Sequence, residues 1–165
     1  MLGGTVHSES KVLETIVKAK MSKLMGTAHS YAHVDRVVNI ATILAQEEQA
    51  DTELVQTAAL LHDIGRTVGD PHNETGAALA RDILRQSTKY PEERVEKIVK
   101  IVLLHPIAFR DRLETLEEKI VWDADKIDLL GLIGITRVFQ WLGKKPFETA
   151  VATCFEELKP VYNLL

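Results

Sequence analysis

Residues 58–66 read Ala-Ala-Leu-Leu-His-Asp-Ile-Gly-Arg and set a histidine beside an aspartate in a mostly apolar stretch. Burying a carboxylate costs several kcal/mol unless a partner or a cation compensates it. His62 and Asp63 therefore need a compensating group, and they lie between two further candidates, His33 and Asp125. Two imidazoles and two carboxylates together suit a divalent metal ion such as Mn, Fe, Co, Ni or Zn, and suit Mg less well. The stretch thus indicates a metal site within the core.

The residues of this set lie on apolar faces of predicted helices. His33 precedes Val37 by four residues, and Asp125 follows Val121 by the same spacing, which puts each pair on one helix face. His62 ends the apolar stripe of its own segment. Structural alternatives stay open at this point. Each histidine could be a core residue bonded to a carbonyl, and the carboxylate could cap a helix or pair with the neighbouring lysine.

The same helical period runs through most of the chain and predicts an all-α fold, a compact bundle of about seven or eight helices. Helices are expected over residues 8–25, 30–49, 52–64, 71–86, 91–104, 114–130 and 132–142, with a last one after Pro146. Irregular segments are expected at 65–70, 87–90 and 106–112. Strands are not expected, because the β-branched residues fall inside helical periods and no Asn-Gly or Asp-Gly turn occurs.

Length and composition predict one domain over residues 1–165, with 1–7 as a flexible lead and 146–165 as a C-terminal helix. The net charge of −4 means that the chain lacks the overall positive charge typical of proteins that bind nucleic acid. The single cysteine, Cys154, excludes an intrachain disulfide, fits a reducing cytoplasm and is expected to be a small packed residue. No apolar run approaches the roughly 18–20 residues that a membrane span needs.

Several side chains outside this set are expected to be structural. The C-terminal helix carries apolar residues at spacings of three and four, which we expect to cover the core rather than pair with a second subunit as a homodimer: Phe147, Val151, Phe155 and Leu158. Trp122 and Trp141 are expected in the core rather than as platforms for base stacking. His7 and His29 fit no pattern and are expected at the surface.

The ordered motifs resemble the HD-domain superfamily of metal-dependent phosphohydrolases, in which a His, a His-Asp pair and a distant Asp occupy successive helices. Four residues match directly: His33, His62, Asp63 and Asp125. Their flanks match as well, in His-Val-Asp-Arg-Val at 33–37 and in the central stretch at 58–66. The segment at 123–134 is similar to the last motif of the small stand-alone bacterial and archaeal HD hydrolases. The resemblance covers roughly residues 25–142.

The resemblance implies a metal-activated water that attacks a phosphate, with the four matching residues as metal ligands. It suggests a nucleotide substrate, cleaved by a pyrophosphatase or a nucleotidase reaction. Other family members use histidines at the places of His72 and His105 to hold a second metal or to contact phosphate or the attacking water. One metal per chain is favoured here, and two metals remain an alternative. His72 and His105 could also be helix-end histidines that face solvent.

Positive charge near the phosphate would come from Arg66 and Lys126, unless these are surface charges or ion-pair partners. Many family members carry a lysine at the position of Arg66, and arginine favours bidentate phosphate contact. Some HD nucleotidases place a glutamate at the same position, so their general acid or base is missing here. Asp128 is the best remaining candidate for that catalytic role, because it shares a motif with Asp125; Asp70 and Glu74 are the others.

Two rival functions remain at this stage. A cyclic or linear phosphodiesterase would use two bound metals to hold the attacking and the leaving oxygen. A non-catalytic sensor would bind metal or nucleotide without turnover. A purely structural bundle with buried polar pairs is a third reading. The expected partner is a small phosphorylated metabolite, with nucleic acid less suited and no membrane.

Overall fold

The computed structural model describes residues 3–143 and 145–164, and within these ranges it contains helices and no strand. Its α-helices are α1 (Gly3–Met21), α2 (Tyr31–Glu47), α3 (Thr52–Leu61), α4 (His72–Ser87), α5 (Glu92–Leu104), α6 (Leu116–Ile127), α7 (Gly131–Leu142) and α8 (Phe147–Leu164). Short 3-10 helices lie between them: η1 (Ser22–Leu24), η2 (Ile64–Thr67) and η3 (Ile107–Arg112). The predicted all-α class and the number of helices are confirmed.

The ends of several helices differ from the prediction, and α6, for example, ends at Ile127 rather than at residue 130. Helix α1 begins at Gly3, so residues 3–7 are helical rather than a flexible lead, while residues 1 and 2 lie outside the described ranges. The start of this helix was predicted from the spacing of apolar residues. The first residues of a helix can lie outside the core without apolar side chains, so this spacing does not mark where the helix begins. Helix α3 ends at Leu61 rather than at residue 64, and η2 continues the chain at Ile64.

Two helix starts are fixed by side-chain caps. The carboxylate of Asp51 accepts a hydrogen bond from the backbone N–H of Leu54 at 3.0 Å, which confirms the expected cap of α3. Arg94 from α5 donates two further hydrogen bonds to the same carboxylate. At α6, Thr115 and Glu118 form a reciprocal capping box. The cap of α3 therefore also ties this helix to α5.

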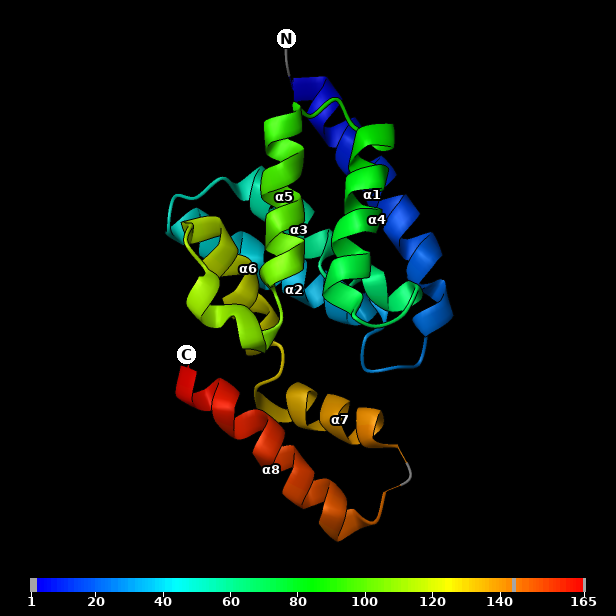
Figure 1. The fold of residues 1–165 in the computed structure, drawn as a ribbon, viewed down its shortest axis with the longest axis vertical. Helices are drawn as coiled ribbons and strands as arrows, with labels where there is room; N and C mark the ends of the chain where they lie inside the picture. The colour runs from blue at the N-terminus through cyan, green and yellow to red at the C-terminus, as the bar shows by residue number, and fades with distance from the viewer. Residues whose placement is uncertain (1–2, 144, 165) are drawn as a thin grey trace.

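The main hydrophobic core is built by helices α1 to α6 (Figure 1). Alanines are frequent at its helix contacts and allow close approach of α2 and α3: Ala41, Ala45, Ala58 and Ala59 are all fully buried. Trp122 on α6 is buried as predicted. Within the described ranges no helix has the length and apolar character needed to cross a bilayer.

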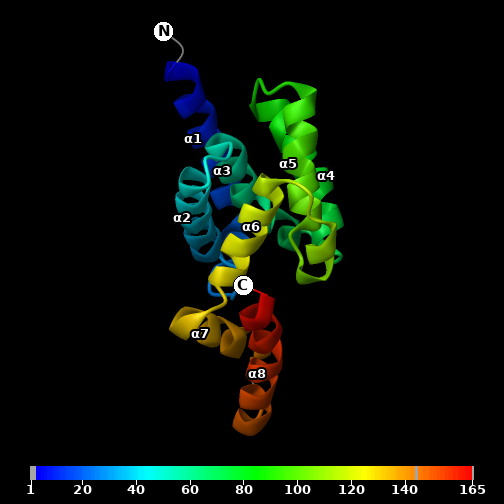
Figure 2. The same cartoon turned by 90° about the vertical axis from the view of Figure 1, so that its left-hand side faces the viewer.

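Helices α7 and α8 form a hairpin at one end of the molecule, with a small hydrophobic cluster of its own (Figures 1 and 2). The expectation that α8 covers the main core is wrong: Phe147 and Phe155 are 70% and 71% exposed. A different line of α8 is buried, formed by Ala150, Cys154 and Val161. Ala150 and Cys154 pack with Val138 and Leu142 of α7, and Cys154 is a packed residue as predicted.

A contact between two glycines sets the position of η2 against α4. A Cβ on Gly65 would lie 1.9 Å from the carbonyl oxygen of His72 and 2.5 Å from the backbone nitrogen of Gly76. Only a glycine fits at residue 65 without moving one of the two backbones. The close approach brings His72 at the start of α4 to the His-Asp pair that precedes η2.

Candidate metal and phosphate site

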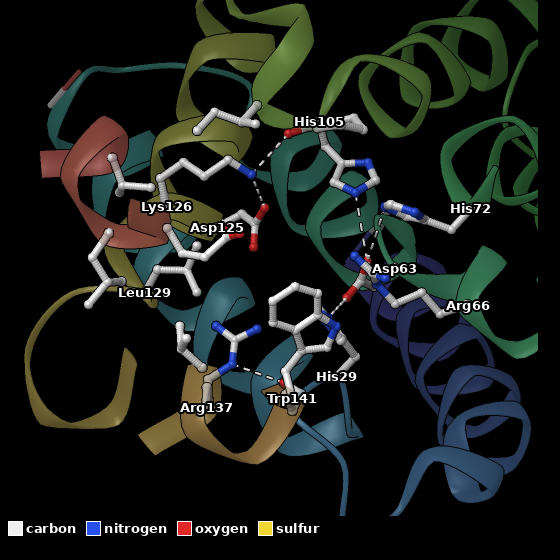
Figure 3. Close-up of a pocket in the computed structure, with 17 residues that line it drawn as sticks. His29, Asp63, Arg66, His72, His105, Asp125, Lys126, Leu129, Arg137 and Trp141 are labelled. Atoms are coloured by element: carbon white, nitrogen blue, oxygen red, sulfur yellow. Dashed lines mark hydrogen bonds and ion pairs between the residues drawn. The ribbon is translucent and has the colours of Figure 1, made fainter. Parts of the chain in front are cut away.

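The site lies where the ends of several helices meet (Figure 3). His62 and His105 directly follow the last residues of α3 and α5. His33 lies near the start of α2, and Asp125 lies near the end of α6. Asp63 follows His62 and precedes η2. All five of these polar side chains are buried, as the apolar helix faces predict for His33, His62 and Asp125.

His33, His62 and Asp125 form the first cluster that could hold a metal ion. The two Nε2 atoms of the histidines lie 3.2 Å apart. Oδ1 of Asp125 lies 3.3 Å from Nε2 of His33 and 3.8 Å from Nε2 of His62. Three potential ligand atoms of the residue types that transition metals prefer therefore converge on one buried point.

The tautomers of the two histidines follow from the partners of their other nitrogens. Nδ1 of His62 lies 2.7 Å from the carbonyl oxygen of Ala59, which can only accept a hydrogen bond. Nδ1 of His33 lies 2.8 Å from a carboxylate oxygen of Asp128. Both rings therefore donate through Nδ1, and in their neutral forms both present a bare Nε2 lone pair to the other. Two lone pairs at this distance require a proton or a metal ion between them.

Burial and hydrogen bonding act in opposite directions on this cluster. Burial lowers the pKa of His62 to about 3, so this ring is neutral at neutral pH and available as a ligand. For His33, burial also lowers the pKa, but the hydrogen bonds to Asp125 and Asp128 outweigh this effect. The pKa of His33 is therefore raised above its usual value. Burial raises the pKa of Asp125, yet Lys126 and the histidines hold it well below its usual range. The carboxylate is therefore ionised and ready to bind a cation.

Asp63 links this cluster to a second one. Its Oδ2 accepts a hydrogen bond from Nδ1 of His29 at 2.9 Å and lies 3.6 Å from Nε2 of His33. Its Oδ1 accepts from Nε of Arg66 at 2.8 Å and lies 3.7 Å from Nε2 of His105. Burial raises the pKa of Asp63, but the neighbouring histidines and Arg66 hold it well below its usual range.

The second cluster consists of Asp63, His72 and His105. Nε2 of His72 lies 4.0 Å from Oδ1 of Asp63. His105 repeats the arrangement of His62, because its Nδ1 lies 2.7 Å from the carbonyl oxygen of Val102 and leaves Nε2 facing Asp63. The two oxygens of one carboxylate thus face two different sets of histidines.

Asp128 lies behind His33 rather than in the pocket. Besides His33, it accepts hydrogen bonds from Arg36 on α2 and from Arg137 on α7, at 2.6 to 3.0 Å. A carboxylate surrounded in this way is suited to fix the orientation of the imidazole, and poorly suited to exchange a proton with a substrate. The sequence placed Asp128 in the right motif but indicated a general acid or base.

Three cations among the described residues border the site. Lys126 is buried and donates hydrogen bonds to Oδ2 of Asp125 and, at 3.2 Å, to the carbonyl oxygen of His105. Arg66 is partly exposed and paired with Asp63. Arg137 on α7 is a site residue that the sequence did not indicate, and its Nε donates to the carbonyl oxygen of Ala28 at 2.9 Å.

A pocket of about 320 Å³ opens over these groups and has two chemically different sides (Figure 3). The first side is ionic and consists of the candidate metal and phosphate groups: His29, Asp63, Arg66, His72, His105, Asp125 and Lys126. The second side is mostly apolar and comes largely from α7 and α8: Leu129, Arg137, Val138, Trp141, Leu158 and Val161.

Two predictions are wrong at this pocket. His29 is not an isolated surface residue, because it bonds to Asp63 and lines the pocket. His29 lies in the turn before α2, so helical spacing gave no signal for its position. Trp141 is not a core residue, since it is 58% exposed and lines the pocket. Phe109, in η3, is not among the lining side chains. The side chain of His7 lies outside the described residues.

Comparisons with known proteins point to one family. The family model of the HD domain matches residues 30–130. The Bacillus subtilis protein YpgQ is 30% identical to this chain over 127 residues. The match covers 72% of this chain and 60% of the length of YpgQ.

Solved structures show the same fold. A predicted HD superfamily hydrolase from an uncultured Thermotogales bacterium has a TM-score of 0.69 and 28% identity, and the match covers 93% of this chain and 87% of the other. The crystal structure of YpgQ in complex with ADP has a TM-score of 0.73 and 24% identity. The match covers 94% of this chain and 82% of the YpgQ chain.

Proposed function

Because the chain belongs to the HD domain family, we propose that it is a metal-dependent phosphohydrolase that acts on a nucleotide. The observation that carries the proposal is the pair of histidine nitrogens 3.2 Å apart, with the ionised carboxylate of Asp125 beside them. HD domains bind divalent metals, and the clusters here offer suitable ligands.

We assign the metal to His33, His62, Asp63 and Asp125, as the resemblance implied. A divalent ion held by these groups would supply a water of lowered pKa and would polarise a phosphoryl oxygen. Asp128 and the carbonyl oxygen of Ala59 hold the histidine rings so that both Nε2 atoms face the site. The ion would be Mn, Fe, Co, Ni or Zn rather than Mg, because nitrogen ligands suit the former.

Arg66 and Lys126 are proposed to neutralise charge on the phosphate as the leaving oxygen departs. Both are already at the site, and each bonds to a proposed ligand carboxylate. Arg66, being partly exposed, can turn toward a substrate, whereas the buried Lys126 mainly keeps Asp125 ionised. In this proposal Asp128 orients His33 and is not the general base.

The pocket supports a small phosphorylated substrate. Its volume of about 320 Å³ falls in the range of small-molecule sites, and its two sides suit a phosphate joined to an apolar group. The complex of YpgQ with ADP supports a nucleotide, cleaved by a pyrophosphatase or nucleotidase reaction. The α7–α8 hairpin lines the same pocket, which supports our proposal that both parts of the chain act as one hydrolase domain.

The second cluster favours one alternative. Asp63, His72 and His105 could hold a second metal, with Asp63 between the two ions. Two metals would favour a cyclic or linear phosphodiesterase, because the attacking and leaving oxygens could each face one ion. With one metal, His72 and His105 would contact the phosphate instead.

The test is the metal content of the purified protein, followed by a screen for phosphate and pyrophosphate release with added Mn, Co, Ni, Mg or Zn. One metal per chain and pyrophosphate release from a nucleoside triphosphate would support the proposal. Two metals and activity on diesters would favour the phosphodiesterase, and bound metal without turnover would favour a sensor. His62→Ala and Asp63→Ala should lose both metal and turnover while keeping the helical signal. Activity retained by Asp125→Ala would contradict the ligand set.

A further inference from the structure

The apolar side of the pocket contains one large exposed side chain. Trp141 lies on α7 with 58% of its surface exposed, although an indole gains several kcal/mol of hydrophobic free energy when it is buried. It lines the pocket together with Asp63 and His29 (Figure 3). Among the described lining residues it is the one aromatic side chain other than a histidine.

The position of Trp141 is fixed relative to the ionic side. Arg137 lies one helical turn earlier on α7 and lines the same pocket. Its guanidinium donates to the carbonyl oxygen of Ala28 and to the carboxylate of Asp128, which in turn holds His33. A chain of hydrogen bonds therefore connects the candidate metal ligands to the helix that carries the indole.

We propose that Trp141 is the stacking platform for the planar base of the substrate, and that α7 and α8 thereby determine which phosphate compounds the site accepts. This inference rests on the proposed function, because it assumes a phosphate bound at the ionic side. Stacking of a base on an aromatic ring tolerates any base, so the residue would select nucleotides over inorganic polyphosphates without selecting one base.

Other aromatic residues do not offer this contact. Trp122 is buried in the core, and Phe109 lies outside the pocket lining beneath the guanidinium of Arg112. Phe155 on α8 is 71% exposed but does not line the pocket. Phe155 therefore serves as a matched control, since its replacement removes an exposed ring from the same hairpin without changing the pocket.

The experiment measures the affinity of the metal-loaded full chain for two non-hydrolysable probes by calorimetry. The first probe, α,β-methylene-ADP, carries a base, and the second, methylenediphosphonate, is its phosphate part alone. Trp141→Ala should weaken binding of the first probe by about tenfold or more and leave the second within about twofold. Trp141→Phe should recover part of the loss, and Phe155→Ala should match the unaltered protein. The first probe should also quench tryptophan fluorescence in the unaltered protein and not in Trp141→Ala.

Each other outcome overturns the inference. Equal losses for both probes would show that Trp141 only supports the fold, and an unchanged affinity would show that it does not touch the base. A change in oligomeric state in Trp141→Ala would assign the ring to an interface between two copies of the chain. Failure of the unaltered protein to bind α,β-methylene-ADP would also refute it. Failure of the proposed function looks different: the probe would bind through Trp141, yet no nucleotide would be cleaved.

Discussion

Nδ1 of His33 lies 2.8 Å from Oδ2 of Asp128, a contact between residues 95 positions apart in the chain. It joins the start of α2 to the residue that follows α6, and Arg137 on the same carboxylate brings α7 into the network. The orientation of one candidate metal ligand thus depends on three separate helices.

Replacing Asp128 should weaken metal binding without removing a proposed ligand. Asp128→Asn takes away the charge that fixes the tautomer and orientation of His33, and we expect metal affinity to fall by about 10- to 100-fold. A competition titration with a chromophoric chelator measures this. Asp123→Asn, on α6 and outside the pocket lining, is the control and should bind metal normally. An unchanged affinity in Asp128→Asn would disprove the orienting role.

Arg66 should matter for substrate rather than for the fold. Arg66→Ala removes a partly exposed cation that bonds to Asp63, and we expect kcat/KM for a nucleotide to fall by about tenfold or more. Arg66→Lys keeps the charge without the bidentate geometry and should recover part of the activity. Steady-state kinetics provides the measurement. If Arg66→Ala leaves both KM and turnover unchanged, the residue is only a surface charge.

The close contact at Gly65 predicts a strong effect of a single methyl group. Gly65→Ala would press a Cβ against the backbone of α4, and we expect it to destabilise the protein by about 1–3 kcal/mol or more. Gly76→Ala is the comparison, because its nearest new contacts lie at 3.3 to 3.5 Å. Urea denaturation should show the larger loss of unfolding free energy for Gly65→Ala. Equal losses for the two variants would contradict this account of η2 packing.

The cap of α3 predicts a pH dependence of stability. Hydrogen bonds from Arg94 and from the backbone N–H of Leu54 lower the pKa of Asp51 in the folded protein. A carboxylate with a lowered folded-state pKa stabilises the fold above its unfolded-state pKa, and this contribution is lost as the pH falls through the folded-state value. The predicted window therefore lies below about pH 4.

Asp51→Asn isolates this contribution, since an asparagine can still cap the helix but carries no charge. The difference in unfolding free energy between the unaltered protein and Asp51→Asn should be largest at neutral pH and shrink between about pH 4 and pH 2. Thermal denaturation at a series of pH values gives this difference. A difference that stays constant with pH would show that the ion pair with Arg94 does not contribute.

The sequence predicted the class of fold from its helical period, and it predicted the gathering of His33, His62 and Asp125 because each lies on an apolar helix face. Asp63 was predicted from its place beside His62. His29 was missed because it lies in a turn before α2, where no periodic pattern indicates which way a side chain points. Trp141 was misplaced for a different reason. A pocket wall and a core are both apolar, so hydrophobicity alone cannot distinguish them.

The burial of α8 could not be read from its sequence either. Apolar residues at spacings of three and four occur on more than one line of this helix, and the line through Phe147 and Phe155 is the more hydrophobic by side-chain size. The structure buries the line through Ala150 and Cys154 instead. Small side chains permit close contact between two helices, and this effect depends on the partner helix rather than on the pattern.

The separate cluster of the α7–α8 hairpin has a consequence for the time course of the reaction. Its buried side chains are few compared with those of the main core, so we expect the hairpin to open at a lower free energy and to exchange its amide hydrogens faster. Because the hairpin forms one wall of the pocket, each opening would release whatever is bound there. The residence time of a product would then depend on how stably α7 and α8 are packed, although these two helices hold none of the proposed metal ligands.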